Sequence, residues 1–249
     1  MTKKIWITGA SSGIGRALAI KFSNEGWQVA ASARRESLLN DLNKSNPNIH
    51  AFVLDVKDEK SVRNVFQNIL QKFETLDICV FATGIHDPEA EKKLSSEKIR
   101  KIMETNFFGT LNCIMAVNSF FREKKDGHIA IVSSVAGYRG LPAASGYCAS
   151  KAALTSLAES LYFDFKRKNI KVSLISPGFI KTPMTDKNTF PMPMIRSPEY
   201  AAEKIFIGLT KKSSFEIHFP KSFTILLKLL KIMPNWLFFW LVERGVKRF

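Results

Sequence analysis

Short, β-rich apolar runs alternate with longer segments of helical periodicity along most of this chain. The runs are KIWIT, WQVAAS, HAFVLDV, DICVFAT, HIAIVSS, KVSLISP and SFEIHF. The segments between them repeat apolar residues at spacings of three and four, as in SVRNVFQNILQKF, which indicates amphipathic helices. Strands that alternate with helices pair in parallel through right-handed crossovers and place helices on both faces of the sheet. The sequence therefore predicts a doubly wound α/β fold with a seven-stranded parallel sheet.

The chain is long enough for one domain of ordinary size. With 249 residues, 45% of them hydrophobic, it can bury a single substantial core. We expect that domain over residues 1–220 and a separate extension over residues 221–249. Helices are predicted near residues 13–25, 35–45, 61–73, 95–124, 147–168 and 198–210.

The net charge of +15 suits nucleic acid, an anionic membrane surface or an acidic protein as a partner. The sequence has no zinc-finger spacing, basic-region heptads or RNP-type motif, so we expect no nucleic-acid binding. Cys79, Cys113 and Cys148 include no C-x-x-C pair and accompany no histidine cluster, so neither a disulfide framework nor a metal site is expected. The N-terminal residues contain no apolar run of signal-peptide length, so we expect a cytoplasmic protein.

A glycine-rich turn, TGASSGIGR, follows the first predicted strand at residues 8–16. Its glycines permit a tight turn and close backbone approach, and the N-terminus of the next helix attracts a pyrophosphate. The pattern G-x-x-x-G-x-G differs in spacing from G-x-G-x-x-G but has the same strand, turn and helix context. We therefore expect the turn to bind a dinucleotide, with contacts from Gly9, Ser11, Ser12, Gly13, Ile14 and Gly15.

The end of the second predicted strand indicates which dinucleotide binds. A carboxylate there suits a free ribose 2′-hydroxyl, whereas arginine suits a 2′-phosphate. This chain has Arg34 and Arg35 at that point, before the first acidic residue, Glu36. The pair favours NADP(H) over NAD(H), although either arginine could instead begin a solvated helix.

The stretch SGYCASKAAL places Tyr147 and Lys151 four residues apart among small residues. In a helix this spacing brings both side chains to one face. The spacing is common by chance, and alone it does not separate a catalytic pair from a surface tyrosine beside a solvated lysine.

Together these features resemble the short-chain dehydrogenase/reductase family, whose members have a Rossmann-like fold. The resemblance covers residues 3–219 and implies an NAD(P)-dependent enzyme that interconverts a carbonyl and a secondary alcohol. Besides the glycine turn, the motifs in the family's order and spacing are LDV at 54–56, NFFG at 106–109, IVSSVAG at 131–137, YCASK at 147–151 and PGFIKT at 177–182.

The resemblance assigns a catalytic set of Asn106, Ser134, Tyr147 and Lys151. Ser134 is preferred to Ser133 because it stands thirteen residues before Tyr147, as the family's catalytic serine does. Ser134 would hydrogen-bond the substrate oxygen, and Tyr147 would exchange a proton with it. Lys151 would hold the nicotinamide ribose and, together with the oxidised nicotinamide, lower the tyrosine pKa from its free value of ~10 toward neutrality. Asn106 either holds a water on the proton route or caps a helix end, and the two roles are compatible.

The resemblance also implies cofactor contacts beyond the glycine turn. Asp55 and Val56 resemble the pair that flanks the adenine ring. Ile180 and Thr182 resemble the segment that contacts the carboxamide and the phosphates. The remaining expected contacts are Gly84, Pro177 and Gly178, together with Tyr147 and Lys151.

One motif departs from the family pattern. After the fourth predicted strand the family often has N-N-A-G, whereas this chain has FATG, with Ala82 and Thr83 in place of Asn and Ala. A structural hydrogen bond made by that asparagine is therefore in doubt. We expect His86 and Asp87, in the loop that follows, to be solvated, and Cys148 to be a packing residue and not a nucleophile.

Residues 184–200 lie where the family has its variable substrate lid. The segment contains three methionines, a phenylalanine and an isoleucine, which predicts an apolar, adaptable pocket wall. We therefore expect a hydrophobic substrate. An ordinary disordered loop is the alternative.

The extension reads KSFTILLKLLKIMPNWLFFWLVERGVKRF. Lys228, Lys231 and Pro234 interrupt its apolar residues, so it is too short to span a bilayer and reads as an amphipathic helix followed by an aromatic segment. From residue 211 onward there are eight basic and two acidic residues. This composition suits peripheral contact with an anionic membrane, but covering the substrate pocket or forming a subunit interface remains open.

The main functional hypothesis is therefore an NADP(H)-dependent carbonyl reductase or alcohol dehydrogenase acting on a hydrophobic substrate. A 3-oxoacyl-carrier-protein-type reductase with an acidic carrier and a non-catalytic dinucleotide-binding module are the alternatives. Family resemblance suggests a homodimer or homotetramer built through the helices near 107–124 and 147–165.

Overall fold

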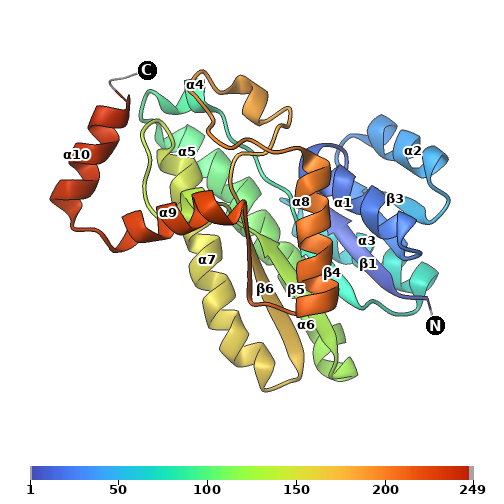
Figure 1. The fold of residues 1–249 in the computed structure, drawn as a ribbon. Coiled ribbons are helices and arrows are strands. Elements are labelled where there is room, and N and C mark those ends of the chain that lie inside the picture. The colour runs from blue at the N-terminus through green and yellow to red at the C-terminus, as the bar shows by residue number, and fades with distance from the viewer. Residues whose placement is uncertain (1, 247–249) are drawn as a thin grey trace.

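The computed structural model describes residues 2–246, and a seven-stranded sheet forms its centre (Figure 1). The strand order is β3-β2-β1-β4-β5-β6-β7, and every neighbouring pair is parallel. The order reverses between β1 and β4, where doubly wound sheets bind ligands beyond the carboxyl ends of their strands. The strands are β1 (Lys4–Thr8), β2 (Gln28–Ala33), β3 (Ile49–Val53), β4 (Ile78–Phe81), β5 (Gly127–Val132), β6 (Ile170–Pro177) and β7 (Glu216–Phe219).

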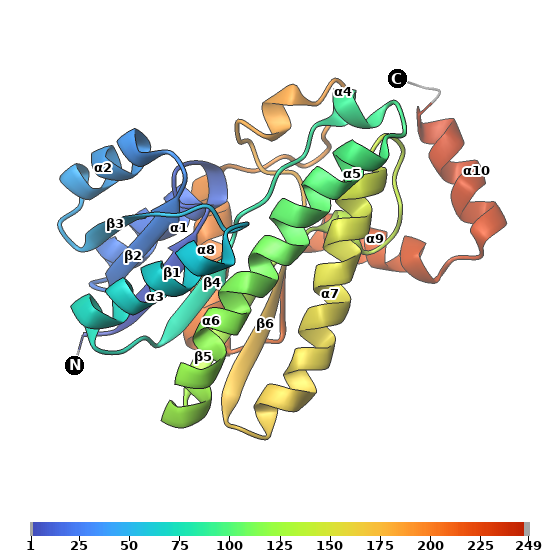
Figure 2. The same ribbon diagram turned by 180° about the vertical axis from the view of Figure 1, so that it is seen from behind.

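Helices cover both faces of the sheet, which confirms the predicted Rossmann-like fold. One face is covered by α1, α2 and α8, and the opposite face by α3, α6 and α7 (Figure 1, Figure 2). Their bounds are α1 (Gly13–Asn24), α2 (Glu36–Ser45), α3 (Glu59–Phe73), α6 (Gly109–Lys124), α7 (Ser145–Lys166) and α8 (Pro198–Ile207).

Alternation along the strands divides the core into two layers. In β1, the side chains of Ile5 and Ile7 lie in the layer under α1 and α8, whereas Trp6 lies in the layer under α3 and α6. Trp6 is fully buried, and its indole N–H donates to the Ser32 hydroxyl at 2.9 Å. The two-sided burial explains why these strands read as apolar runs with little polar alternation.

Three local features were not predicted. The helix expected over residues 95–124 is divided into α5 (Ser96–Met103), a π-helical turn (Glu104–Phe108) and α6. A second π-helical turn (Gly208–Lys212) extends α8. The loop after β4 contains a short helix, α4 (Pro88–Glu91). Single π-helical turns within helices are frequent at functional sites, and the first of these carries Asn106.

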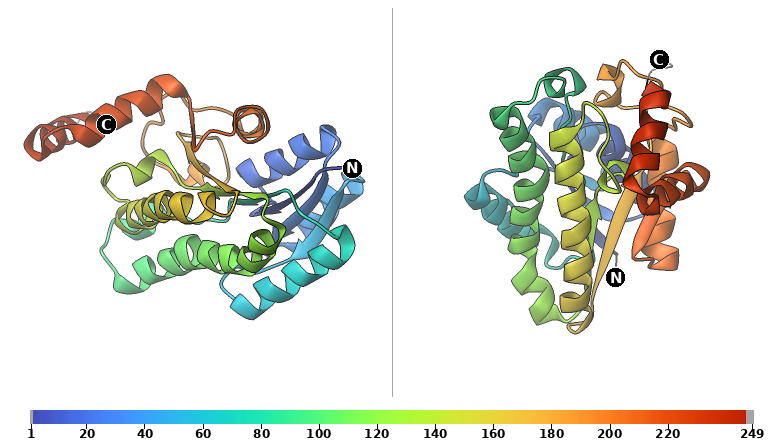
Figure 3. Two further views of the ribbon diagram at one scale, coloured as in Figure 1. Left: turned by 90° about the horizontal axis from the view of Figure 1, so that it is seen from below. Right: turned by 90° about the vertical axis from the view of Figure 1, so that its left-hand side faces the viewer.

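The C-terminal extension forms two helices, α9 (Lys221–Ile232) and α10 (Asn235–Val246), which we call the C-terminal arm. The helices are separated at Met233 and Pro234, where the sequence predicts a break. Figure 3 shows the arm extending away from the sheet. Within residues 2–246, no helix has the length and apolar character needed to cross a bilayer.

Candidate active site

The turn between β1 and α1 can be formed only by small, flexible residues at two positions. Gly9 has φ = +73°, and a Cβ there would lie 2.8 Å from the Ala82 carbonyl oxygen. A Cβ on Gly15 would lie 2.4 Å from the Gly9 carbonyl oxygen. The first turn of α1 contains no acidic residue, and its N-cap, Ser12, makes no side-chain cap bond. The N-terminus of α1 is therefore suited to bind an anion through its backbone N–H groups.

Arg35 connects the end of β2 to this glycine turn. Its Nη2 donates to the hydroxyls of Ser11 at 2.8 Å and Ser12 at 2.6 Å. Arg35 is the N-cap residue of α2, and its side chain does more than begin a solvated helix. Arg34 is exposed beside it and lines the same cavity. Both arginines therefore line the cavity next to the glycine turn.

One cavity of about 480 Å³ joins the glycine turn to the N-terminal part of α7. Its volume lies within the usual range for small-molecule and cofactor sites. All the predicted cofactor contacts line it. Beyond the glycine turn and the arginines these are Asp55, Val56, Gly84, Tyr147, Lys151, Pro177, Gly178, Ile180 and Thr182.

Tyr147 and Lys151 lie on the cavity side of α7. The Lys151 Nζ lies 5.7 Å from the centroid of the Tyr147 ring and donates to the Val132 carbonyl oxygen at 2.9 Å. Burial lowers the pKa of Lys151 to about 8. Burial also raises the pKa of Tyr147 to about 12, against a hydrogen bond from Ser134 that lowers it. Without cofactor, therefore, the tyrosine pKa moves in the direction opposite to the one expected for the oxidised complex, because desolvation disfavours the phenolate.

The two neighbouring serines after β5 point in different directions. Ser133 is buried, donates to the Lys151 carbonyl oxygen at 2.8 Å and lies 3.1 Å from the Thr155 hydroxyl. Ser134 instead faces the Tyr147 phenol, whose pKa it lowers, and its hydroxyl accepts from the Ala136 N–H at 3.2 Å. The geometry thus places Ser134, and not Ser133, beside the phenol.

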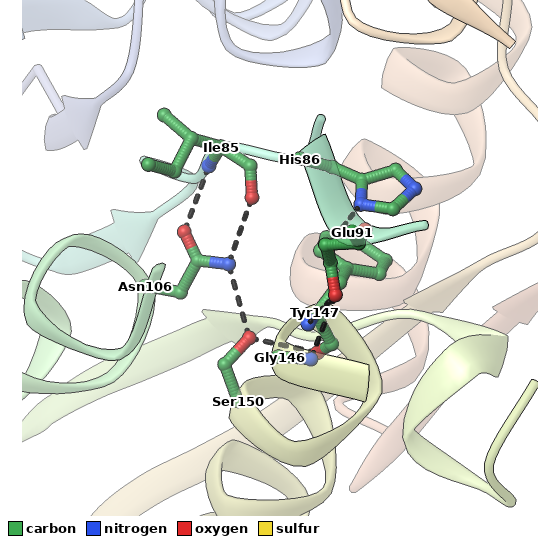
Figure 4. Close-up of polar contacts among 7 residues, drawn as sticks. All are labelled: Ile85, His86, Glu91, Asn106, Gly146, Tyr147 and Ser150. Carbon is green, nitrogen blue, oxygen red and sulfur yellow. Dashed lines mark hydrogen bonds and ion pairs between the residues drawn. The ribbon is translucent and has the colours of Figure 1, made fainter. Parts of the chain in front are cut away.

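Asn106 is fully buried and holds the loop after β4 (Figure 4). Its Oδ1 accepts from the Ile85 N–H at 2.7 Å, and its Nδ2 donates to the Ile85 carbonyl oxygen and the Ser150 hydroxyl, each at 3.0 Å. The proposed helix-end cap is therefore wrong, because the amide binds Ile85 and Ser150 and no helix terminus. The loop adjacent to Ile85 is fixed against α7 as a result.

The expectation of a solvated His86 is also wrong. The side chain of His86 is only 10% exposed, and its ring lies 4.4 Å from the Tyr147 ring, centroid to centroid. Its Nδ1 is 2.9 Å from Oε1 of Glu91, whose other oxygen accepts from the N–H groups of Gly146 at 2.7 Å and Tyr147 at 3.2 Å (Figure 4). Glu91 was missed because nothing local in the sequence connects it to a helix that begins over fifty residues later.

Comparison with known proteins indicates the family of this chain. The family model for short chain dehydrogenases matches residues 3–216. The chain belongs to this family. A Myxococcus xanthus protein named an uncharacterized oxidoreductase is 33% identical over 236 residues, which cover 93% of each chain. The 3-oxoacyl-(acyl-carrier-protein) reductase of Thermotoga maritima is 29% identical, covering 84% of this chain and 91% of its own. The solved structure of ElxO with NADP bound has a TM-score of 0.77 and 27% identity, covering 88% of this chain and 98% of ElxO.

This short-chain dehydrogenase is therefore an oxidoreductase, and its cavity fits the nicotinamide dinucleotide that the family uses. The fit rests on the glycine turn, which has no room for a Cβ, and on the uncapped N-terminus of α1 beside two arginines.

Two further features concern the turn after β4 and the cysteine beside Tyr147. The Ala82 N–H donates to the Thr8 hydroxyl at 3.2 Å, so a threonine on β1 supports the FATG turn. Cys148 is buried, and burial raises its pKa, as befits a packing residue.

The predicted lid contributes less to the cavity than its composition indicates. Met184 lines the cavity, but Phe190, Met194 and Ile195 are exposed. Phe190 makes an edge contact with Phe179, with ring centroids 6.1 Å apart. The lid also forms an isolated parallel bridge between residues 180 and 196.

Proposed function

We propose that this short-chain dehydrogenase is an NADP(H)-dependent oxidoreductase that interconverts a carbonyl and a secondary alcohol on a hydrophobic substrate. The observation that carries the proposal is the convergence of Ser134, Tyr147 and Lys151 on the cavity that begins at the glycine turn. A bound nicotinamide would supply or accept the hydride. The chain itself must orient the carbonyl and move the proton.

Ser134 and Tyr147 both act on the substrate oxygen. Both hydroxyls can hydrogen-bond a carbonyl oxygen, and this polarises the carbonyl and stabilises the charge that develops on the oxygen. In reduction Tyr147 donates its proton to that oxygen, and in oxidation it accepts one. The pKa of about 12 keeps Tyr147 protonated in the cofactor-free protein, ready to act as an acid. The Lys151 ammonium supports the phenolate that forms when the proton leaves.

The arginines support NADP(H) over NAD(H). A 2′-phosphate on the adenine ribose needs planar or charged donors near the end of β2, and guanidinium groups provide them. Arg34 is exposed at that point, and Arg35 lies over Ser11 and Ser12. The NADP-bound structure of ElxO, a protein of the same fold, is consistent with this preference.

Aromatic side chains beside the cavity, near the end of β6, support a hydrophobic substrate. Phe179 packs against Phe223 with ring centroids 5.6 Å apart and against Phe190 of the lid. Phe179 follows β6 after Pro177 and Gly178, which line the cavity, and it joins the lid to Phe223 of α9 beside that cavity. An apolar carbonyl compound would pack against this side.

The test is cofactor binding and turnover by the purified protein. NADPH and NADH binding is measured first, and cofactor oxidation is then followed by absorbance with aliphatic, aromatic and steroid-like ketones. Turnover with NADPH, abolished in Tyr147→Phe with cofactor affinity nearly unchanged, supports the proposal. Tight NADPH binding without turnover of any ketone contradicts it.

A carrier-bound substrate is a second candidate, favoured by the net charge of +15 and by the relationship to the Thermotoga maritima reductase. A basic surface could bind an acidic carrier protein that presents a 3-oxoacyl group. Reduction of the 3-oxoacyl thioester on acyl-carrier protein, with little reduction of the same thioester on coenzyme A, would identify this function. Efficient reduction of free lipophilic ketones would exclude it as the main activity.

A further inference from the structure

The N-terminus of α7, which carries Tyr147, has no cap of its own. Its N-cap residue is Ala144, which makes no side-chain cap bond, and its first turn contains no acidic residue. Free N–H groups at a buried helix start require acceptors from elsewhere. Glu91, on α4, provides one by accepting from Gly146 and Tyr147 (Figure 4).

The carboxylate of Glu91 is buried, and hydrogen-bond donors surround it. Its side chain is 1% exposed, and three N–H groups surround its two oxygens: two from the backbone of α7 and one from His86. Burying a carboxylate is costly unless such donors compensate it, and the N-terminus of α7 adds a favourable dipole.

His86 extends this arrangement from the backbone of Tyr147 to its ring. Burial lowers the pKa of His86 and outweighs Glu91, which raises it, so the ring is neutral at pH 7 and its Nδ1–H donates to the carboxylate. The rings of His86 and Tyr147 lie 32° from parallel. The contact is a tilted one, with the ring centroids 4.4 Å apart. Glu91 thus fixes the backbone at Tyr147, and His86 supports its ring.

We propose that Glu91 and His86 are positioning residues that hold the Tyr147 phenol in place for proton transfer. The proposal rests on the proposed function. Glu91 is the anchor, because it binds both the helix start and His86, and His86 acts on the ring by stacking. In this arrangement the loop after β4 and the catalytic helix form one unit, with Asn106 holding the other side of the loop through Ile85.

Four variants separate these roles. Glu91→Ala removes the anchor, and we expect kcat to fall by about 100-fold, the cost of displacing a reacting group by about 1 Å, with KM for NADPH nearly unchanged. Glu91→Gln keeps an oxygen for the two backbone N–H groups and should recover most of kcat. His86→Phe keeps the stacked ring and should retain more activity than His86→Ala. Glu97→Ala, at an exposed position on α5, is the matched control.

Hydrogen exchange tests the same proposal without turnover. The amides of Gly146 and Tyr147 should exchange faster in Glu91→Ala than in the wild type or in Glu97→Ala, while amides in β5 keep their protection. This result is measurable even if no ketone is reduced, so failure of the proposed function and failure of the positioning role can be told apart. Unchanged exchange in Glu91→Ala, or loss of kcat that Glu91→Gln does not restore, would overturn the proposal.

A second inference comes from the C-terminal arm and does not depend on the reaction. Apolar side chains gather on its outer surface: on α9 these are Ile225, Leu226, Leu229 and Ile232, exposed by 50, 54, 55 and 80%, and on α10 they are Trp236, Phe239 and Trp240, exposed by 72, 58 and 46%. Scattered apolar residues are ordinary on a surface, but contiguous ones mark a contact.

The arm is a fixed part of the structure. The inner side of α9 buries Phe223 against Val135 and Tyr138. Arg139 donates to the carbonyl oxygens of Leu230 at 2.7 Å and Met233 at 2.8 Å, at the end of α9, and its guanidinium lies 3.9 Å from the centroid of the Phe238 ring. The apolar outer surface is thus held outward.

The charge of the arm indicates its partner. At 3.6 residues per turn, Lys221 and Lys231 fall along one edge of the outer apolar surface of α9 and are exposed, whereas Lys228 is ion-paired with Glu216 of β7. From residue 221 to the end of the sequence there are six basic residues and one acidic residue. Tryptophan, phenylalanine and leucine bordered by lysine are typical of helices that lie in the interface of an anionic bilayer.

We infer that the C-terminal arm docks on the surface of an anionic lipid bilayer, with α9 and α10 lying along it. Each helix is 12 residues long, which suits the plane of the interface and not a span. The lysines at the edge of α9 would meet the headgroups while the outer apolar side chains enter the acyl boundary. Contact through the arm would place the lid side of the cavity close to a lipid phase.

Vesicle co-sedimentation of the full chain tests this inference. The protein should sediment with phosphatidylglycerol/phosphatidylcholine vesicles, less with phosphatidylcholine alone, and less at high salt. Binding should be lost in the double variant Leu229→Ser/Ile232→Ser but kept in Leu38→Ser, which changes an exposed apolar residue on α2. Absence of sedimentation would overturn the inference. So would a fall in molar mass by light scattering in the double variant, because the arm would then be covered by a second copy of the chain.

Discussion

The ammonium of Lys151 lies 5.7 Å from the centroid of the Tyr147 ring and is bonded to the main-chain carbonyl of Val132 at the end of β5. The lysine is 4% exposed, and burial lowers its pKa to about 8 without a carboxylate partner that would raise it. The ammonium of Lys151, which supports the phenol, therefore loses its proton at a lower pH than an exposed lysine would.

A first prediction concerns this sensitivity. Lys151 must be charged to support the Tyr147 phenolate, so kcat/KM, which reports the free enzyme, should fall as the pH rises through about 8. In Lys151→Met the rate should be lower by about 100-fold or more, the usual contribution of acid–base catalysis, and the decline near pH 8 should vanish. Lys166→Met, at an exposed position on the same helix, should keep the wild-type profile. A profile that is flat from pH 7 to 9 in the wild type would contradict the assignment.

A second prediction concerns the loop that Asn106 holds. Asn106→Ala leaves the N–H and C=O of Ile85 and the hydroxyl of Ser150 without this partner, and unpaired buried groups cost about 1–3 kcal/mol each. We expect the free energy of unfolding in urea to fall by at least about 3 kcal/mol. Asn112→Ala removes a single bond, to the Val56 carbonyl oxygen at 3.0 Å, and should cost less. Equal losses of unfolding free energy in the two variants would show that the bonds of Asn106 to Ile85 do not stabilise the fold more than the single bond of Asn112.

Much of the fold could be predicted because its signals are local. Strands such as KVSLISP and helices such as SVRNVFQNILQKF carry their periodicity in the sequence, and the structure places them as β6 and α3. The π-helical turn at Asn106 could not be predicted, because the sequence carries no local pattern for it, and the bonds of Asn106 to Ile85 and Ser150 join residues far apart in the chain.

The same distinction holds within the candidate site. The glycine turn, Ser134, Tyr147 and Lys151 lie in short motifs and could be placed together from sequence. Glu91 lies in a polar stretch, PEAEKK, that resembles an ordinary solvated loop. Only the packing of α4 against the start of α7 shows that its carboxylate is buried.

A third prediction separates the two arginines. Arg34 is exposed, and its expected role is limited to the 2′-phosphate, so Arg34→Ala should weaken NADPH binding by about 10–100-fold, the value of a charge-assisted hydrogen bond, and leave NADH binding unchanged. Arg35 also holds Ser11 and Ser12 of the glycine turn. Arg35→Ala should therefore weaken the binding of both cofactors. Fluorescence titration of each variant with each cofactor gives the four dissociation constants, and loss of NADH affinity in Arg34→Ala would show that the specificity assignment is wrong.

The last prediction concerns stability and comes from His128 in β5. The ring is buried, its Nε2 is 2.8 Å from the Ser173 hydroxyl, and that hydroxyl donates to the Ser214 carbonyl oxygen at 2.7 Å. The Nε2–H therefore donates to Ser173, which joins β5 to β6 by a chain of hydrogen bonds. Burial lowers the pKa of His128 from 6.5 to about 4.

Since the folded-state pKa lies below the unfolded one, the unfolded chain binds more protons between these values. The stability is present above about pH 6.5 and is lost as the pH falls toward about 4, by about 3 kcal/mol in total. Urea unfolding of the wild type and of His128→Leu at pH 7.5 and 5 measures this difference. The variant should be less stable at pH 7.5 but should lose less stability on acidification, and an equal acid-induced loss in both proteins would assign the pH dependence to other groups.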